Sequence, residues 1–259
     1  MTEPTVQTTP DAAAARPRKA GRRPKSPDGA PGISREMIIQ CTLELARKES
    51  LSEMSMVRVA KELDVAPGLV HYYMGSRDNL LSCAINEVFR ERMEAMPPLT
   101  GDWRYDVAAM VQTTLAVTAH WPGLWGYVVT RNRFRLFQKV EAGETDYGLM
   151  FFNYFGQVLK DAGFPPQKAA LVFYLLMLFA TSIGAERENR QAPNLHRDFI
   201  MDYVSRFDRK SVPGAAFLAD PFSKLPNELA TETGLRLLLD GMEPWRRSSA
   251  PRKRAASRK

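Results

Sequence analysis

Apolar residues recur every three or four positions along most of the chain. Ile38, Cys41 and Leu45 show this helical spacing near the start. No Val- and Ile-rich stretch of alternating polarity, bounded by turn residues, interrupts the pattern, so it predicts an all-α fold. Helices are expected from Ser34 to about Glu49, from Ser55 to Leu63, from Pro67, from Ser76 to before Pro97, and over 103–119, 122–130, 145–162, 166–188 and 228–240. The Pro-rich stretch 213–225 is expected to be irregular.

Both ends of the chain differ from the rest in composition and charge. Residues 1–32 are rich in Ala, Pro, Thr and Arg and carry six basic against three acidic side chains. Residues 244–259 carry seven basic side chains and no acidic one. We expect both tails to be disordered, because they have too little apolar surface to bury. Basic arms on a mildly acidic body indicate a polyanionic partner; the alternative is that they only aid solubility.

Pro97 and Pro98 divide the body into two predicted domains, 33–94 and 98–243. The longest apolar run, "AALVFYLLMLFA", is shorter than the roughly 20 residues that cross a bilayer, so we expect no membrane span. Two cysteines give neither a disulfide framework nor a zinc set, and the basic N-terminus lacks the apolar segment of a secretion signal. We therefore expect a cytoplasmic protein without a metal or other cofactor.

The segment "VAPGLVHYYMGSRDNLL" after the second helix predicts a helix-turn-helix. A turn at 64–66 joins two short helices, and Val59, Leu63, Val65, Val70 and Met74 are expected to face inward between them. Pro67 and Gly68 would let the second helix approach base edges closely, and the planar side chains that follow could reach bases and phosphates.

In this segment the chain resembles the TetR family of bacterial transcriptional regulators. The resemblance rests on "TLELARKESLSEMSMVRVAKELDVAPGLVHYYMGSRDNLL" and extends to "DWRYDVAAMVQTTLAVTAHWPGLWGYVVT" and "TGLRLLLDGMEPW", roughly residues 33 to 245. It implies a three-helix DNA-binding domain followed by a larger helical domain of the tetracycline-repressor branch. The DNA contacts that it implies are Ser55, Arg58, Pro67, Gly68, Leu69, His71, Tyr72, Tyr73 and Arg77.

Three residues depart from the family pattern. Ala66 replaces the usual Ser or Thr and loses a helix cap. Leu69 replaces the usual Thr, so an apolar contact to a thymine methyl becomes the expected readout at that position. Asp64 replaces the usual Gly in the turn, where a left-handed backbone suits glycine better.

Residues 33–94 hold eight basic and ten acidic side chains, which gives a helix-turn-helix little general attraction for phosphates. The arm "RPRKAGRRPK", with Arg22 and Arg23, could restore it by entering a minor groove. The alternative is an inert tail.

Aromatic and Met-rich helices of the larger domain could enclose a small, largely apolar organic effector. The alternative is that the same side chains are packed core. The candidate ligand contacts are Tyr127, Thr130, Phe151, Phe155, Tyr174, Met177, Leu178 and Thr181. Tetracycline is a poor candidate, because none of the three histidines falls in the two most apolar helices and no metal is implied.

The resemblance also implies a homodimer through the helices near 166–188 and 228–240, since one recognition helix reads only a half-site. The predicted function is a cytoplasmic, nucleoid-associated repressor that an effector releases from a palindromic operator by pivoting 76–93. The alternative is an activator or a ligand-independent DNA-binding protein of the same fold. An enzyme is not expected, because no catalytic signature is present.

Overall fold

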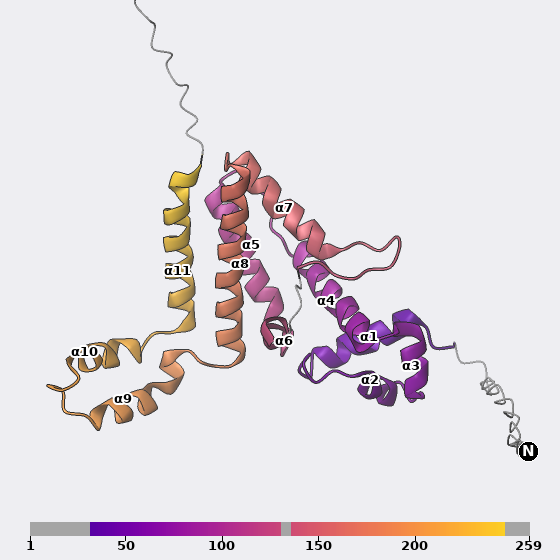
Figure 1. Cartoon of the computed structure of the whole chain (residues 1–259), viewed down its shortest axis with the longest axis horizontal. Coiled ribbons are helices and arrows are strands. Elements are labelled where there is room, and N and C mark those ends of the chain that lie inside the picture. The colour runs from indigo at the N-terminus through magenta and orange to yellow at the C-terminus, as the bar shows by residue number, and fades with distance from the viewer. Residues whose placement is uncertain (1–31, 131–135, 247–259) are drawn as a thin grey trace, which may run out of the picture. The chain divides into compact units, whose positions relative to one another are not determined.

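Every regular element in the described chain is a helix, as the pattern of apolar positions predicted (Figure 1). The computed structural model describes residues 32–130 and 136–246. The segments 1–31 and 247–259, and with them most of the two basic tails, lie outside the described residues.

Four helices form the N-terminal part: α1 (Arg35–Ala46), α2 (Met56–Glu62), α3 (Pro67–Met74) and α4 (Arg77–Glu94). Three serines cap these helices as predicted, and each hydroxyl accepts a backbone N–H three residues ahead. Ser34 accepts from Met37 at 3.2 Å, Ser55 from Arg58 at 3.1 Å, and Ser76 from Asn79 at 3.1 Å. A cap of this kind satisfies one of the N–H groups that a helix start leaves unpaired.

The turn between α2 and α3 shows the effect of two departures from the family pattern. Asp64 adopts a φ of +52°, the left-handed conformation in which a glycine is usual. Ala66 is the N-cap of α3 and supplies no side-chain hydrogen bond. Burial of Val59, Val70 and Met74 still fixes α3 against α2, because none of the three is more than 3% exposed.

The C-terminal part contains α5 (Trp103–Thr118), α6 (Leu124–Thr130), α7 (Tyr147–Asp161), α8 (Pro166–Glu188), α9 (Arg197–Ser205), α10 (Pro213–Phe222) and α11 (Asn227–Met242), with short 3-10 turns at Pro193–His196 and Glu243–Trp245. Its core is built by α5, α7, α8 and α11, and Phe151, Phe155 and Leu176 at its centre are fully buried. Gly163 ends α7 with a φ of +87°, as expected for a C-terminal cap.

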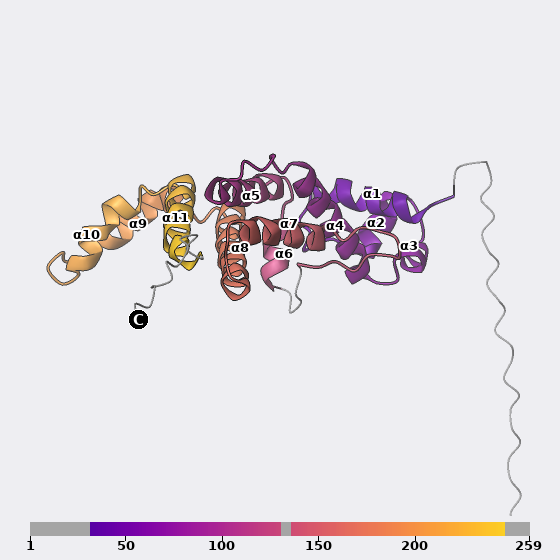
Figure 2. The same cartoon turned by 90° about the horizontal axis from the view of Figure 1, so that it is seen from above.

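Helix α4 packs against both parts of the chain. It contacts α1 and α3 on one side and α5 and α7 on the other (Figure 2). Residues from Ser34 onward form one compact unit, and the predicted boundary between 33–94 and 98–243 falls where α4 ends. This helix fixes α3 relative to the C-terminal core.

The prediction that residues 213–225 are irregular is wrong, because most of this stretch forms α10. Pro213 occupies the first helical position, where its missing N–H costs nothing, and Pro221 falls one residue before the helix ends. The helix α9, which packs on α10, was also not predicted. At the start of the predicted C-terminal tail, Glu243–Trp245 form a 3-10 turn and the Nε of Arg246 donates to the Ala162 carbonyl at 2.8 Å.

Replacing Ala66 by Ser is expected to stabilise the protein, because the new hydroxyl can cap α3. The expected gain in unfolding free energy is about 1 kcal/mol. Denaturant unfolding of the two chains measures it, with Ala116→Ser in the exposed interior of α5 as the control. In the control position the same hydroxyl has no cap to make, and a gain of equal size there would refute the capping explanation.

Candidate nucleic-acid interface

The helix α3 presents an exposed face of unusual composition. Burial of Val70 and Met74 holds one side of the helix, and this leaves Pro67, Gly68 and His71 exposed and Leu69 half-buried. Tyr72 is 80% exposed, and its ring meets that of Tyr73 edge-on at 5.4 Å. Two adjacent exposed tyrosines on a short helix form a surface that is suited to a partner rather than to solvent.

Gly68 lies in open space at the start of α3. A Cβ added to it would meet no atom within 4 Å, and its φ does not lie in the left-handed region. The fold itself therefore does not require a glycine at this position. The absent side chain leaves the backbone at the start of α3 open to a close approach by another molecule.

The side chains of Ser55 and Arg58 both form hydrogen bonds within the protein. The Ser55 hydroxyl caps α2, and the Arg58 guanidinium binds Glu49 (Nη2 to Oε1, 2.6 Å) and Glu62 (Nη1 to Oε2, 2.8 Å). The hydrogen bond from Arg58 lowers the pKa of Glu49. A phosphate that binds Arg58 has to compete with these two carboxylates.

Arg77 anchors the start of α4. Its Nε donates to the Met54 carbonyl at 2.6 Å and its Nη2 to the Ser52 carbonyl at 2.8 Å. These bonds attach α4 to the loop between α1 and α2, so movement of α4 is transmitted to the helix-turn-helix. The other predicted arginines, Arg22 and Arg23, lie outside the described residues.

The predicted ligand contacts do not lie together. Tyr127, Phe151 and Phe155 are buried in the interior, whereas Tyr174 and Leu178 are 58% and 46% exposed. Met177 and Thr181 are partly exposed, and Thr130 ends α6 with its side chain outside the described set. Because α8 is apolar on every side, its sequence pattern could not show which face points inward.

A cavity of about 280 Å³ lies among α5, α6 and α8, and none of those predicted contacts lines it. Its lining includes the indoles of Trp121 and Trp125, and Glu188 is at its edge. The Glu188 carboxylate accepts from the backbone N–H groups of Trp125 and Gly126, each at 3.1 Å, and so caps α6. The sequence analysis did not predict this lining; the two tryptophans of "HWPGLWG" (120–126) are the feature of the sequence that could have indicated it.

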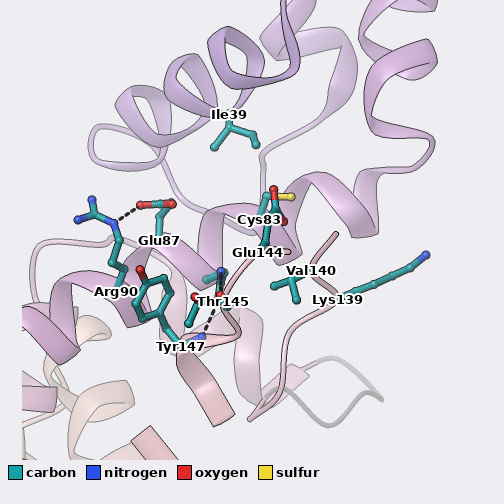
Figure 3. Close-up of a pocket in the computed structure, with 10 residues that line it drawn as sticks. Ile39, Cys83, Glu87, Arg90, Lys139, Val140, Glu144, Thr145 and Tyr147 are labelled. Atoms are coloured by element: carbon teal, nitrogen blue, oxygen red, sulfur yellow. Dashed lines mark hydrogen bonds and ion pairs between the residues drawn. The ribbon is translucent and has the colours of Figure 1, made fainter. Parts of the chain in front are cut away.

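A smaller pocket of about 170 Å³ lies where α1 and α4 meet the segment that precedes α7 (Figure 3). Arg35 of α1 binds Glu144 of that segment at 2.6 Å. Asn86 of α4 donates to the Thr145 carbonyl at 2.9 Å and accepts from the Tyr147 N–H at 3.0 Å. These bonds form a polar junction between the N-terminal helices and the C-terminal core.

Cys83 also lines this pocket. Burial raises the pKa of its thiol, so the side chain is protonated at neutral pH and is a poor nucleophile.

One buried cation was missed by the sequence analysis. Arg92, near the end of α4, is only 4% exposed. Its guanidinium lies 3.7 Å from the centre of the Phe151 ring and 4.2 Å from that of Phe89. The only sequence signal was its place four residues after Val88, on the apolar side of α4, where an arginine is unexpected.

No protein-family model matches the chain, but curated relatives and solved structures do. The transcriptional regulator BetI of Stenotrophomonas maltophilia is 27% identical over 74 residues, which are 29% of this chain and 38% of BetI. The transcriptional repressor DrrR1 of Streptomyces coeruleorubidus is 30% identical over 104 residues, 40% of this chain and 38% of DrrR1. The chain thus spans about two fifths of these relatives' lengths. The six matching curated relatives are all transcriptional regulators, and none is an enzyme.

Among solved structures, apo ActR of Streptomyces coelicolor superposes with a TM-score of 0.70 at 22% identity, over 84% of this chain and 98% of ActR. ActR in complex with actinorhodin gives the same TM-score and identity over 85% and 99%. ActR is a TetR family protein. The chain therefore has the TetR-family fold, with an N-terminal helix-turn-helix followed by a larger helical domain.

The open space around Gly68 leads to a direct test of the interface. Gly68→Ala is expected to leave thermal stability unchanged or slightly higher, and to weaken binding to a preferred DNA duplex by about tenfold through steric exclusion from the groove. Titration of a labelled duplex measures the affinity. The control is Gly214→Ala in α10, which also has no atom within 4 Å of an added Cβ. Equal affinities for the parent and Gly68→Ala would show that α3 does not approach DNA by its N-terminus.

Proposed function

We propose that this chain, which has the fold of the TetR-family regulators, is a homodimeric DNA-binding transcriptional repressor that a small organic effector releases from a palindromic operator. It would act in the cytoplasm, on the nucleoid. The observation that carries the proposal is the exposed outer face of α3, which the α2–α3 packing holds away from the core. An α-helix of this kind fits the major groove of B-DNA.

The residues of α3 divide into roles by their position. Pro67 and Gly68 at the N-terminus permit close approach, and Leu69 offers an apolar contact to a thymine methyl. His71, Tyr72 and Tyr73 supply planar polar groups for bases and phosphates. Ser55, Arg58 and Arg77 flank the groove as phosphate contacts, and the arm with Arg22 and Arg23 adds the positive charge that residues 33–94 lack.

Self-association is supported by an apolar face that no other part of the described chain covers. On α8, Leu171, Tyr174 and Leu178 are between 38% and 58% exposed and recur at intervals of three and four residues. On the adjacent α11, Leu229 and Leu237 are 49% and 64% exposed. A second copy that covers this face would complete a four-helix interface and place two recognition helices on one duplex.

The same face raises a second reading of α8. By length and composition alone, the segment Pro166–Ser205 could span a membrane, and 28% of its most apolar window is buried. Arg187 of this segment is held by the side chains of Asn227 and Thr231 on α11, which is a polar contact between packed helices. We therefore assign the exposed apolar residues to a protein partner.

The switch follows from the position of α4. Its N-terminus is bonded to the α1–α2 loop through Arg77, and its remaining length packs on α5 and α7 of the regulatory core. An effector that binds the core in one position of α4 more tightly than in another would shift the recognition helices of the dimer. The bonds of Asn86 and Glu144 connect α1 and α4 to the segment before α7, so a movement of α4 relative to the core would change them.

Selection from a library of random duplexes tests the function. The purified protein is expected to enrich a palindrome whose half-sites are centred about 34–36 Å apart, one DNA turn. Sequencing of the bound fraction after several rounds reads the result, and Tyr72→Ala carried through the same rounds is the control. Recovery of no common sequence by the parent protein would refute the proposed function.

Leu178→Asp is expected to break the dimer, because it places a charge within the exposed apolar face of α8. Sedimentation velocity should show a monomer, and operator affinity should fall by about tenfold or more, since half-sites are then bound singly. The matched control is Leu149→Asp on α7, where the leucine is 53% exposed. If both variants remain dimeric, the interface lies elsewhere.

A further inference from the structure

Two charged side chains are deeply buried in the described chain, and only one of them has its hydrogen bonds satisfied. Asp106 is 5% exposed, and its carboxylate accepts from the Thr100 N–H and hydroxyl at 2.8 Å each and from the Gly101 N–H at 3.1 Å. Arg92 is 4% exposed, and its Nε and Nη2 have no hydrogen-bond partner among the described residues. A buried donor without a partner is costly and rare in folded proteins.

No described group near Arg92 carries a negative charge that would balance its own. Its guanidinium lies between the rings of Phe89 and Phe151, and the described chain brings no carboxylate within ion-pair distance. Burial is the one cause that lowers the pKa of Arg92, to about 9, so the side chain is still a cation at neutral pH. Contact with ring faces offsets only part of the cost of removing a cation from water.

The two unpartnered nitrogens, Nε and Nη2, lie on the same edge of the guanidinium and can bind one ligand group together. Nε–H and one Nη2–H form one edge of the guanidinium and point the same way. This edge matches the two oxygens of a carboxylate, or two oxygens of a sulfonate or phosphate, in a bidentate pair. An isolated apolar core would be more stable without such an edge, whereas an anion-binding site needs it.

We propose that Arg92 anchors an acidic group of the effector, and that the effector is an aromatic acid whose ring packs among Phe89, Phe151 and their neighbours. This inference rests on the proposed function and changes the expected ligand from a largely apolar molecule to one with an apolar frame and one anionic group. Phe151, which the sequence analysis placed at the ligand, is then the contact that the structure joins to Arg92.

The position of Arg92 also links ligand binding to DNA binding. Arg92 and Arg77 lie on the same helix, fifteen residues and about 22 Å apart. The Arg77 end is bonded to the α1–α2 loop, so an anion that draws the Arg92 end to a new position turns one rigid element against the helix-turn-helix. Arg92 is therefore placed to couple the two sites.

Two fluorescent probes that differ only in an acidic group test the proposal. 8-Anilinonaphthalene-1-sulfonate is an anion, and N-phenyl-1-naphthylamine is the same frame without the sulfonate. Titrations of the full chain should show that Arg92→Met weakens binding of the sulfonate by about tenfold or more. Affinity for the neutral probe should change less than about twofold. Arg92→Lys should retain part of the preference for the anion, since it keeps the charge and loses the bidentate edge.

The matched control is Arg90→Met, which removes an arginine from the same helix that is paired with Glu87 and Glu94. It should leave both probe affinities unchanged. Thermal unfolding supplies a second readout: Arg92→Met should melt at the same temperature as the parent or a few degrees higher, because an uncompensated buried charge is removed.

A purely structural Arg92 predicts the opposite results. If Arg92→Met lowers the melting temperature and weakens both probes equally, or if the parent binds neither probe, the proposal is overturned. None of these measurements uses DNA. Failure of duplex selection would therefore refute the regulator while leaving the anion site, and loss of the anion preference would refute the site while leaving the regulator.

Discussion

The packing of α4 against both halves of the molecule is the constraint on which the rest of the structure depends. Its 18 residues bury Leu81, Ile85 and Val88 completely, and the helix contacts α1 and α3 as well as α5 and α7. A helix that is held by side-chain packing on two sides moves as a rigid body. A change in the position of α4 relative to the core therefore affects its contacts with α1 and α3.

Polar bonds supplement this packing at the start and in the middle of the helix. Arg77 binds the loop between α1 and α2, and Asn86 binds the backbone just before α7. After Asn86, the buried side chains of the helix are Val88, Phe89 and Arg92, so Arg92 is the one charge among them. A single cation without a partner in that position is a local conflict with an otherwise consistent core, and such conflicts are expected at functional sites.

The exposed face of α3 and the exposed faces of α8 and α11 differ in composition. The outer face of α3 combines a free glycine with exposed tyrosines, and its composition suits a nucleic-acid groove. The outer faces of α8 and α11 are aliphatic and aromatic, with Gly234 of α11 held against the Phe179 ring of α8 so closely that a Cβ would come within 2.7 Å of it. The second surface is built as a pair of tightly packed helices, which is the arrangement of a helical-bundle interface.

The amino-acid sequence by itself determined the all-α fold, nearly all helix starts and the helix-turn-helix. These features depend on local physics: the serine caps at 34, 55 and 76 and the three-and-four spacing of apolar residues act within a few positions of the chain. The inward position of Val70 and Met74, and with it the outer face of α3, followed from the same spacing. The helix α10 was missed because a high proline content was read as irregular, although one proline stands at the first helical position and the other beside the end.

Only the tertiary structure decided which apolar residues form the core and which charged residues are already paired. The helix α8 is apolar on all sides, so its sequence could not show that Leu176 is buried while Tyr174 and Leu178 are exposed. The pairing of Arg58 with Glu49 and the isolation of Arg92 beside Phe151 join residues that are 9 and 59 positions apart in the chain. Contacts of this kind depend on how helices meet in space, and no periodicity in a single segment records them.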